Sequence, residues 1–342
     1  MSFLSAHPLQ PFWNLAAAPI QATALNIALT RDVFGHLQQP TGAAEAADSL
    51  GLEPGQAEAL LELLWSMGLL TRYHGTAEPL FQTSSLAQQY FMESSDHNCR
   101  EAWQFRYASL QRSSQLMADQ FQLSNPDDEA GHAPFTAGGS WATAARVQIG
   151  QEQSIVAAPA LMQALTQLEE LPTQGRFLDL GGGPGFLAIA LARQFSALRG
   201  TLFDLPDTAE VAAENIRDAG LSSRICTLGG NIETDDIGSD YDLIICVSVM
   251  HFMAAPDLAL KKIFQALRPG GIFVSAHALR QNDAASAAEI LPFYTPMRLQ
   301  GRFVPTQADW LTLLEQTGFR HNRCSEVRNT PMAPLQLSLS QR

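Results

Sequence analysis

A glycine-rich turn near the middle of the chain constrains the fold more than any other feature. The apolar segment 177–180 leads directly into Gly181-Gly182-Gly183-Pro184-Gly185, and a helical pattern begins at Phe186. Glycines let the chain turn tightly and let a ligand approach the backbone. A second predicted strand ends at Asp204, where an acid is suited to binding two ribose hydroxyls. The pattern predicts a cofactor site at the edge of a parallel sheet.

The same alternation of strand and helix continues toward the C-terminus. Apolar runs such as 243–247 are typical of strands covered on both faces. Such alternation predicts an α/β fold with a doubly wound, mostly parallel, Rossmann-like sheet. Segment 327–340, interrupted by Pro331 and Pro334, is expected to form an antiparallel pair of edge strands. The expected strands are 176–180, 200–204, 224–228, 242–247 and 272–277, and helices should begin after Pro184 and at Thr208, Pro256 and Thr306.

The first 150 residues have a mainly helical pattern. Thr41 can cap a helix, and Pro54 can begin a second helix that ends at Gly68. Two short strands, 69–73 and 80–83, are expected next, which together outline a winged helix. We therefore predict a winged-helix domain over residues 1–150 and a cofactor-binding catalytic domain over residues 151–342.

The charge of the chain argues against a nucleic-acid partner. It has 21 basic and 34 acidic side chains, for a net charge of −13. The second helix of the predicted winged helix contains Glu58 and Glu62 and no basic residue. Neutralising a phosphate backbone requires a basic surface. A packing or dimerisation role is therefore favoured over that of a transcription factor, and we expect a homodimer formed through this domain.

Membrane and metal sites are not expected either. No apolar run approaches the ~18 residues of a membrane span, and residues 1–18 contain no Lys or Arg, unlike the start of a signal peptide. The four cysteines are far apart and lack C-x-x-C spacing, which argues against a zinc site or a disulfide framework. A cytoplasmic enzyme with reduced thiols is the expectation.

Two cofactors are compatible with the glycine turn. A dinucleotide places its pyrophosphate at the helix N-terminus, usually beside a third glycine, but Phe186 stands at that position. Asp179 is unfavourable beside a pyrophosphate, whereas it suits the positive sulfonium and amino groups of S-adenosylmethionine. The residues thus favour S-adenosylmethionine. A nicotinamide dinucleotide, as in an oxidoreductase, and a turn without any ligand stay as alternatives.

Several motifs in their order along the chain resemble one family. The chain resembles the class I, plant-type small-molecule O-methyltransferases and their bacterial secondary-metabolism relatives, which combine a winged-helix dimerisation domain with a Rossmann-like catalytic domain. The resemblance implies S-adenosylmethionine as methyl donor and His251 as general base. The motifs are LDLGGGPG at 178–185, FDLPD at 203–207, GGNI at 229–232, VMHF at 249–252 and LRPGG at 267–271.

The resemblance also implies where the cofactor is bound. Gly181 and Gly183 would line it, Asp204 would bind the ribose, and Asn231 and Ile232 would flank the adenine. The full set of expected cofactor-binding residues is Asp179, Gly181, Gly183, Asp204, Leu205, Gly230, Asn231, Ile232 and Val247.

Several positions depart from the family pattern, among them Val247, where the plant enzymes have a Lys, and Phe252-Met253, where they have Asp-Trp. The family usually has Asp in place of Asn231, although an amide oxygen can also accept a hydrogen bond from the adenine amine. Two Glu residues support the catalytic His in the plant enzymes, and the aligned positions here are His277 and a residue near Val304. His277 is therefore a second catalytic candidate that could pair with His251 or bind substrate. A solvent-facing residue at a strand end is the alternative.

The acceptor is expected to be a small aromatic or heteroaromatic molecule with a reactive hydroxyl. Aromatic and Met side chains suit a flat acceptor, although core packing is the alternative for each. Methylation of N, S or C, and hydroxylation or decarboxylation by an atypical member, stay open. The candidate substrate-binding residues are Trp103, Arg106, Trp141, Phe252, Met253, Phe293 and Met297.

Overall fold

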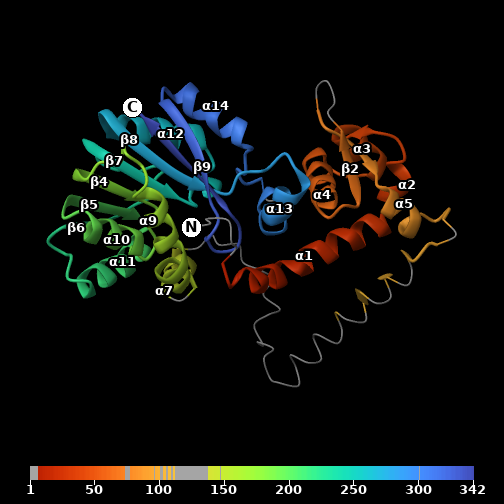
Figure 1. The fold of residues 1–342 in the computed structure, drawn as a ribbon, viewed down its shortest axis with the longest axis horizontal. Coiled ribbons are helices and arrows are strands. Elements are labelled where there is room, and N and C mark those ends of the chain that lie inside the picture. Colours follow the sequence, from red (N-terminus) through yellow and green to blue (C-terminus); the bar gives the residue numbers. More distant parts are fainter. Residues whose placement is uncertain are drawn as a thin grey trace, which may run out of the picture. The chain divides into compact units, whose positions relative to one another are not determined.

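Figure 1 shows the computed structural model, which describes residues 7–73, 78–95, 97–100, 103–104, 107–108, 111, 138–146, 148–299 and 301–342. The chain divides into two compact units. The first consists of Met1–Pro11, Pro134–Arg280 and Arg302–Arg342, and the second of Phe12–Ala133 and Gln281–Gly301. No helix among the described residues has both the length and the apolar character to cross a bilayer.

A seven-stranded sheet forms the centre of the first unit. Its strand order is β6-β5-β4-β7-β8-β10-β9. The first five strands in this order are parallel, whereas β10 is antiparallel to both β8 and β9. This confirms the predicted doubly wound sheet. The strands are β4 (Gln174–Leu180), β5 (Ala197–Asp204), β6 (Ile225–Gly229), β7 (Tyr241–Val247), β8 (Leu267–His277), β9 (Arg320–Val327) and β10 (Leu335–Gln341).

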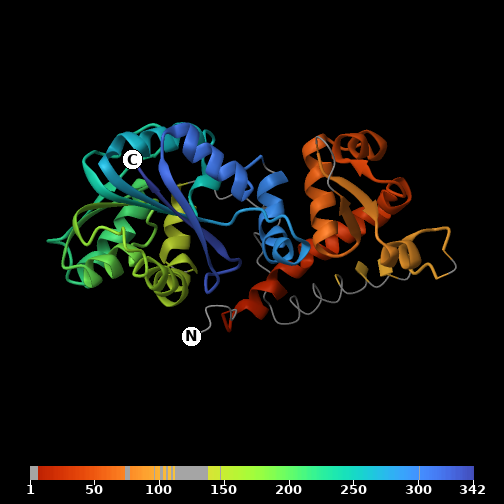
Figure 2. The same cartoon turned by 45° about the horizontal axis from the view of Figure 1, so that its top comes forward.

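Helices cover both faces of this sheet, which explains the apolar runs in its strands. In Figure 2 the green helices α10 and α11 lie on one face, and the cyan and blue helices α12 and α14 lie on the other. Phe177, Leu178 and residues 243–246 are accordingly buried. The helices of this unit are α7 (Gly138–Arg146), α8 (Gln148–Glu152), the π-helical η2 (Gln153–Ala157), α9 (Ala158–Leu165), α10 (Phe186–Gln194), α11 (Pro206–Asp218), the 3-10 turn η3 (Met250–Phe252), α12 (Pro256–Ala266) and α14 (Gln307–Thr317).

The strand order defines where a ligand can bind. From β4 the chain moves outward through β5 and β6, and then returns to the other side of β4 with β7 and β8. Leu180 and Cys246 are neighbours at the carboxyl ends of β4 and β7. In open α/β sheets ligands bind at this reversal of direction, so the glycine turn after β4 lies at the expected position.

The C-terminal strand pair differs from the prediction. β9 begins at Arg320, before the expected segment 327–340, and β10 lies between β8 and β9. Of these two strands, only β9 therefore lies at an edge of the sheet. The mostly polar residues of β9 are largely exposed, whereas β10, which lies inside the sheet, is buried almost throughout.

The second unit contains the predicted winged helix. α3 and α4 are followed by β2 and β3, and the three-stranded order is β1-β3-β2. Thr41 does not cap α3, because it pairs with Phe81 in β1 and Gly42 takes the capping position. α4 begins with a capping box between Glu53 and Gln56. The elements are α1 (Gln10–Thr30), α2 (Val33–His36), β1 (Thr41–Gly42), α3 (Ala43–Leu50), α4 (Pro54–Ser66), β2 (Leu70–Tyr73), β3 (Leu80–Thr83) and α5 (Ser85–Phe91).

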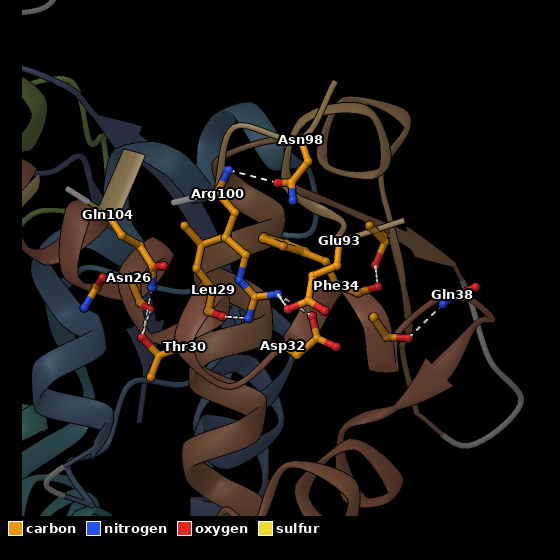
Figure 3. Close-up of polar contacts among 12 residues, drawn as sticks. Asn26, Leu29, Thr30, Asp32, Phe34, Gln38, Glu93, Asn98, Arg100 and Gln104 are labelled. Atoms are coloured by element: carbon orange, nitrogen blue, oxygen red, sulfur yellow. Dashed lines mark hydrogen bonds and ion pairs between the residues drawn. The ribbon is translucent and has the colours of Figure 1, made fainter. Parts of the chain in front are cut away.

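Arg100 holds the end of α1 within this unit (Figure 3). Its guanidinium donates to the backbone carbonyl of Leu29 in the last turn of α1. It also pairs with Asp32 at 2.9 Å and with Glu93 at 3.1 Å. A cation at a helix C-terminus offsets the negative end of the helix dipole, so Arg100 links α1 to the segment that follows α5.

One helix from the C-terminal half belongs to the second unit. α13 (Ala284–Leu299) contributes Ala287 and Leu291 to the apolar core of the winged helix. Its Arg298 forms ion pairs with Glu62 at 2.5 Å and Glu58 at 3.5 Å. Since α13 belongs to the second unit, the two units do not follow the single boundary at residue 150. A functional division at that boundary stays a prediction.

Candidate cofactor and catalytic site

The glycine turn has a backbone that side chains rarely adopt. Gly181 and Gly183 have φ values of 68° and 58°, in the left-handed region that favours glycine. A Cβ at Gly181 would also lie 2.3 Å from Cγ2 of Val249. The turn after β4 therefore packs directly against the segment that follows β7 and leads to His251.

Asp204 connects the tip of β5 to this turn. Its Oδ2 accepts a hydrogen bond from the Gly183 N–H at 2.8 Å, and its Oδ1 accepts one from the Leu205 N–H at 2.7 Å. Burial raises the pKa of Asp204, while these two bonds act in the opposite direction. The acid expected to bind ribose thus lies at the turn, as the spacing predicts.

Asp179 lies buried beneath the turn, with 2% of its surface exposed. Its carboxylate accepts a hydrogen bond from the Ala188 N–H, and Oδ2 has no hydrogen-bond partner among the described residues. Burial, together with the charge of Asp204, raises the pKa of Asp179 to about 7. A nearby cation would favour the ionised form, so this carboxyl is suited to a positively charged ligand.

The N-terminus of α10 is already hydrogen-bonded to protein groups. The Phe186 N–H donates to Oε1 of Gln153 at 2.8 Å, and the Ala188 N–H donates to Asp179. Pyrophosphate binding at a helix N-terminus uses these first N–H groups. Because the Gln153 amide and the Asp179 carboxylate already accept from these N–H groups, the site disfavours the pyrophosphate of a dinucleotide. The sequence predicted the same from Phe186 and Asp179.

The residues expected around adenine differ in their surroundings. The Gly230 N–H donates to the Asp204 carbonyl at 2.8 Å, which fixes it beside β5. Oδ1 of the exposed Asn231 already accepts from the Glu233 N–H at 2.9 Å, although an amide oxygen has a second lone pair. Ile232 is buried in the core shared with α12 and α14, and Val247 is half-buried at the end of β7.

His251 lies in the 3-10 turn η3, which follows β7, and is 4% exposed. Burial lowers its pKa to about 4, and a hydrogen bond to the Ser248 backbone partly offsets this effect. The imidazole is therefore neutral at neutral pH. When one ring nitrogen donates to a carbonyl, the other has a lone pair that can accept a proton. Ser248 itself has a left-handed φ of 55°, uncommon for a residue other than glycine.

His277 ends β8 and is also buried, with 3% of its surface exposed. The solvent-facing alternative is therefore wrong. Its ring centroid lies 5.9 Å from that of His251, with the ring planes at 82°. Neither ring nitrogen has a hydrogen-bond partner among the described residues, and burial lowers the pKa of His277 well below the usual value. The structure brings together the two histidines singled out in the sequence.

The space beside these rings is narrow and mostly apolar. It does not admit a water molecule. Trp310 contacts His277 with ring centroids 5.2 Å apart, and its Nε1 donates to Ser338 at 2.8 Å. The lining residues are Met250, His251, His277, Ala278, Leu279, Phe303, Pro305 and Trp310.

Two of the expected substrate residues meet next to His251. Trp141 of α7 contacts Phe252 edge-on, with ring centroids 4.9 Å apart, and Phe252 lies 5.0 Å from the His251 ring. Met253 packs instead against the apolar core of the sheet. Trp103, Phe293 and Met297 belong to the second unit, while Arg106 lies outside the described residues.

Two functional candidates have no signal in the sequence. Gln153 contacts the glycine turn from a helical connector. Oε1 of Glu233 accepts hydrogen bonds from the N–H groups of Ala254 and Ala255 at 2.7 and 3.3 Å, which supports the start of α12 just after η3. Both depend on contacts between distant segments. Within the described ranges, no three His, Cys, Asp or Glu side chains are grouped as metal ligands.

Comparison with known proteins identifies the family. A family model described as an O-methyltransferase domain matches residues 128–320. Demethylspheroidene O-methyltransferase from Cereibacter sphaeroides is 32% identical over 190 residues, which cover 53% of this chain and 46% of that protein. The aligned part thus spans about half the length of this curated relative.

Two solved structures share the fold over the whole chain. An O-methyltransferase family 2 protein from Planctomyces limnophilus, in complex with apigenin, aligns with 100% of this chain and 98% of that chain, with a TM-score of 0.77 and 19% identity. Human N-acetylserotonin methyltransferase in complex with SAM covers 100% and 99%, with a TM-score of 0.52 and 21% identity. At these identities the likeness shows the fold alone. Because the family model matches more than half of its residues, the chain belongs to the O-methyltransferase family.

Proposed function

We propose that this chain transfers a methyl group from S-adenosylmethionine to a hydroxyl of a small aromatic or heteroaromatic acceptor, with His251 as general base. One observation supports the proposal above the others. The segment with the buried, neutral His251 follows β7 directly, and its Val249 lies against Gly181 of the glycine turn. The proposed base and the proposed cofactor turn are therefore parts of one packed site.

The residues of the turn fit S-adenosylmethionine. This cofactor supplies an electrophilic methyl group on a sulfonium, and it has no phosphate. Oδ2 of Asp179 lacks a partner among the described residues, so a cation could offset its buried charge. A Cβ at Gly183 would lie no closer than 3.7 Å to any side chain, so the left-handed backbone, and not a lack of space, favours glycine there. Asp204 is proposed to bind the ribose hydroxyls, and Leu205, Gly230, Asn231, Ile232 and Val247 to flank the nucleoside.

The pKa of His251 limits how proton transfer can occur. A phenol has a pKa near ~10, whereas that of His251 is about 4. Complete proton transfer before alkylation would cost about 8 kcal/mol for a difference of about six pKa units. The imidazole is therefore proposed to take the hydroxyl proton as the acceptor oxygen is alkylated, when that oxygen becomes strongly acidic. Alignment of the acceptor then contributes much of the rate.

The aromatic pair beside His251 is the proposed binding surface for the acceptor. Trp141 and Phe252 present ring faces and edges that a flat molecule can contact. His277 is proposed to support His251 or the acceptor through its unpaired nitrogens. The roles of Trp103, Arg106, Met253, Phe293 and Met297 in acceptor binding stay predictions.

The assembly and location are also proposed. Phe12 and Leu15 on α1 are 66% and 70% exposed, and such apolar surface favours burial against a second copy of the chain. A homodimer through the N-terminal part is therefore proposed. Cys99 and Cys226 are exposed free thiols, which suits the reducing cytoplasm.

Incubation with S-adenosylmethionine labelled at the methyl group tests the reaction. The label should appear in the acceptor, and product analysis should find it on oxygen. Label on N, S or C would retain the cofactor assignment but refute the hydroxyl acceptor. Consumption of the acceptor without incorporation of label would favour hydroxylation or decarboxylation and would refute methyl transfer.

A further inference from the structure

A π-helical turn contacts the glycine turn from outside the strand–turn–helix unit. Gln153 opens this turn, Gln153–Ala157, between α8 and α9. π-Helical turns are rare and are frequent at functional sites. The half-buried side chain of Gln153 comes from a segment far from the glycines in sequence, so it is an independent contact to the cofactor turn.

The amide of Gln153 bridges the two ends of the turn. Its Nε2 donates to the Gly182 carbonyl at 3.2 Å, and its Oε1 accepts from the Phe186 N–H at 2.8 Å. The same Nε2 lies 3.9 Å from the position of a Cβ at Gly183. One side chain thus forms hydrogen bonds to the chain on both sides of Gly183, the second left-handed glycine of the turn.

One of these two hydrogen bonds satisfies a group that the turn itself leaves unpaired, and the other adds to the Gly182 carbonyl, which also accepts from the Gly185 N–H at 3.1 Å. The Phe186 N–H is in the first turn of α10, where no partner exists within the helix. Glycines lose more backbone freedom on ordering than other residues, so a turn rich in glycine gains from an external contact. A turn that is ordered before the ligand arrives binds more tightly, because less ordering accompanies binding.

We propose that Gln153 is a positioning residue for the cofactor. It holds the glycine turn in its binding conformation, and its amide satisfies the N–H of α10 that a phosphate would otherwise bind. This selects a nucleoside cofactor without a phosphate at the turn. The inference rests on the proposed function, since it concerns the same S-adenosylmethionine site.

The variant Gln153→Met tests the role, because Met has a similar length and makes neither hydrogen bond. Isothermal calorimetry should show that the Kd of S-adenosylhomocysteine rises about tenfold, which corresponds to about 1.4 kcal/mol, because the turn must then be ordered on binding. With both substrates saturating, kcat should change less than twofold, since Gln153 is not expected to contact the acceptor. Gln163→Met, at an exposed position on α9, is the matched control and should bind as the wild type does.

The variant Gln153→Glu separates the two halves of the bridge. A Glu oxygen can still accept from the Phe186 N–H, but it cannot donate to the Gly182 carbonyl. Its Kd should therefore lie between those of the wild type and Gln153→Met. This variant also provides a measurement if Gln153→Met does not fold.

The outcomes distinguish this role from the proposed function. If Gln153→Met binds S-adenosylhomocysteine within twofold of the wild type, Gln153 has no positioning role. If both Gln153 variants bind equally weakly, the hydrogen bond from the Phe186 N–H does not contribute to binding, and this part of the proposal is refuted. If the wild type itself does not bind S-adenosylhomocysteine, the proposed cofactor is wrong, and the inference about Gln153 is refuted with it.

Discussion

Asp179 is expected to destabilise the cofactor-free protein at neutral pH. Its pKa is about 7 in the folded protein, against an ordinary value of 3.8. Because the folded state favours the protonated carboxyl, the contribution of Asp179 to the free energy of unfolding is greatest below about pH 4 and falls as the pH rises toward 7. The difference between the two pKa values corresponds to a loss of about 4 kcal/mol in the free energy of unfolding from this group.

The variant Asp179→Asn removes this ionisation and keeps an oxygen for the Ala188 N–H. Urea denaturation without cofactor should show that the variant is more stable than the wild type at pH 8, by up to about 4 kcal/mol, with little difference near pH 4. Asp48→Asn, at an exposed position on α3, is the matched control for the same substitution away from the site.

Bound S-adenosylmethionine should offset the destabilisation that the ionised Asp179 carboxyl causes at neutral pH. A cation next to the carboxyl favours the ionised form, so the affinity of the wild type for S-adenosylmethionine should rise through about pH 7. Asp179→Asn should bind it more weakly at pH 8 and without this rise. If the variant has the same stability difference at pH 4 and pH 8, or binds the cofactor as the wild type does, the environment inferred for Asp179 is wrong.

Three further predictions concern the base and the assembly. His251→Ala should lower kcat by about 10²–10⁴ and leave the Kd of S-adenosylhomocysteine nearly unchanged; full turnover of a neutral phenol would show that no base is needed. The value of kcat/KM for the acceptor should fall as the pH drops through about 4, because that is the pKa of His251 without acceptor, and a rise centred near pH ~6.5 would contradict its burial. Light scattering at micromolar concentration should give the mass of a dimer, whose interface is expected to bury roughly 2,000 Å² or more. Leu15→Glu should yield monomers, and a monomeric wild type would refute the dimer.

Local sequence patterns were sufficient for the elements that form the cofactor edge. The apolar strand, the glycine turn and the helix after it are adjacent in sequence, and residues 174–194 adopt this order in the structure. Asp204 at the end of the next strand lies on the turn through the Gly183 N–H. The helix–turn–helix and wing were predictable for the same reason, since capping residues and glycines act on their immediate neighbours.

Local sequence patterns did not predict the surroundings of individual side chains. From the sequence, His277 could be either a solvent-facing or a catalytic residue. In the structure it is buried, and Trp310 of α14 packs beside it. Asn231 could be proposed to bind adenine, but its bond to the Glu233 N–H depends on the local turn. Trp141 and Phe252 had no pattern that placed them together.

The sequence by itself determined which segments become strands, helices and tight turns, because hydrophobic periodicity, glycines and capping residues act over a few positions. Only the tertiary structure decided that Gln153 bridges the glycine turn, that α13 joins the core of the winged helix, and that His251 and His277 are buried side by side. The physical reason is that hydrogen-bond partners, burial and the resulting pKa values depend on groups brought together from distant parts of the chain, which no local pattern encodes.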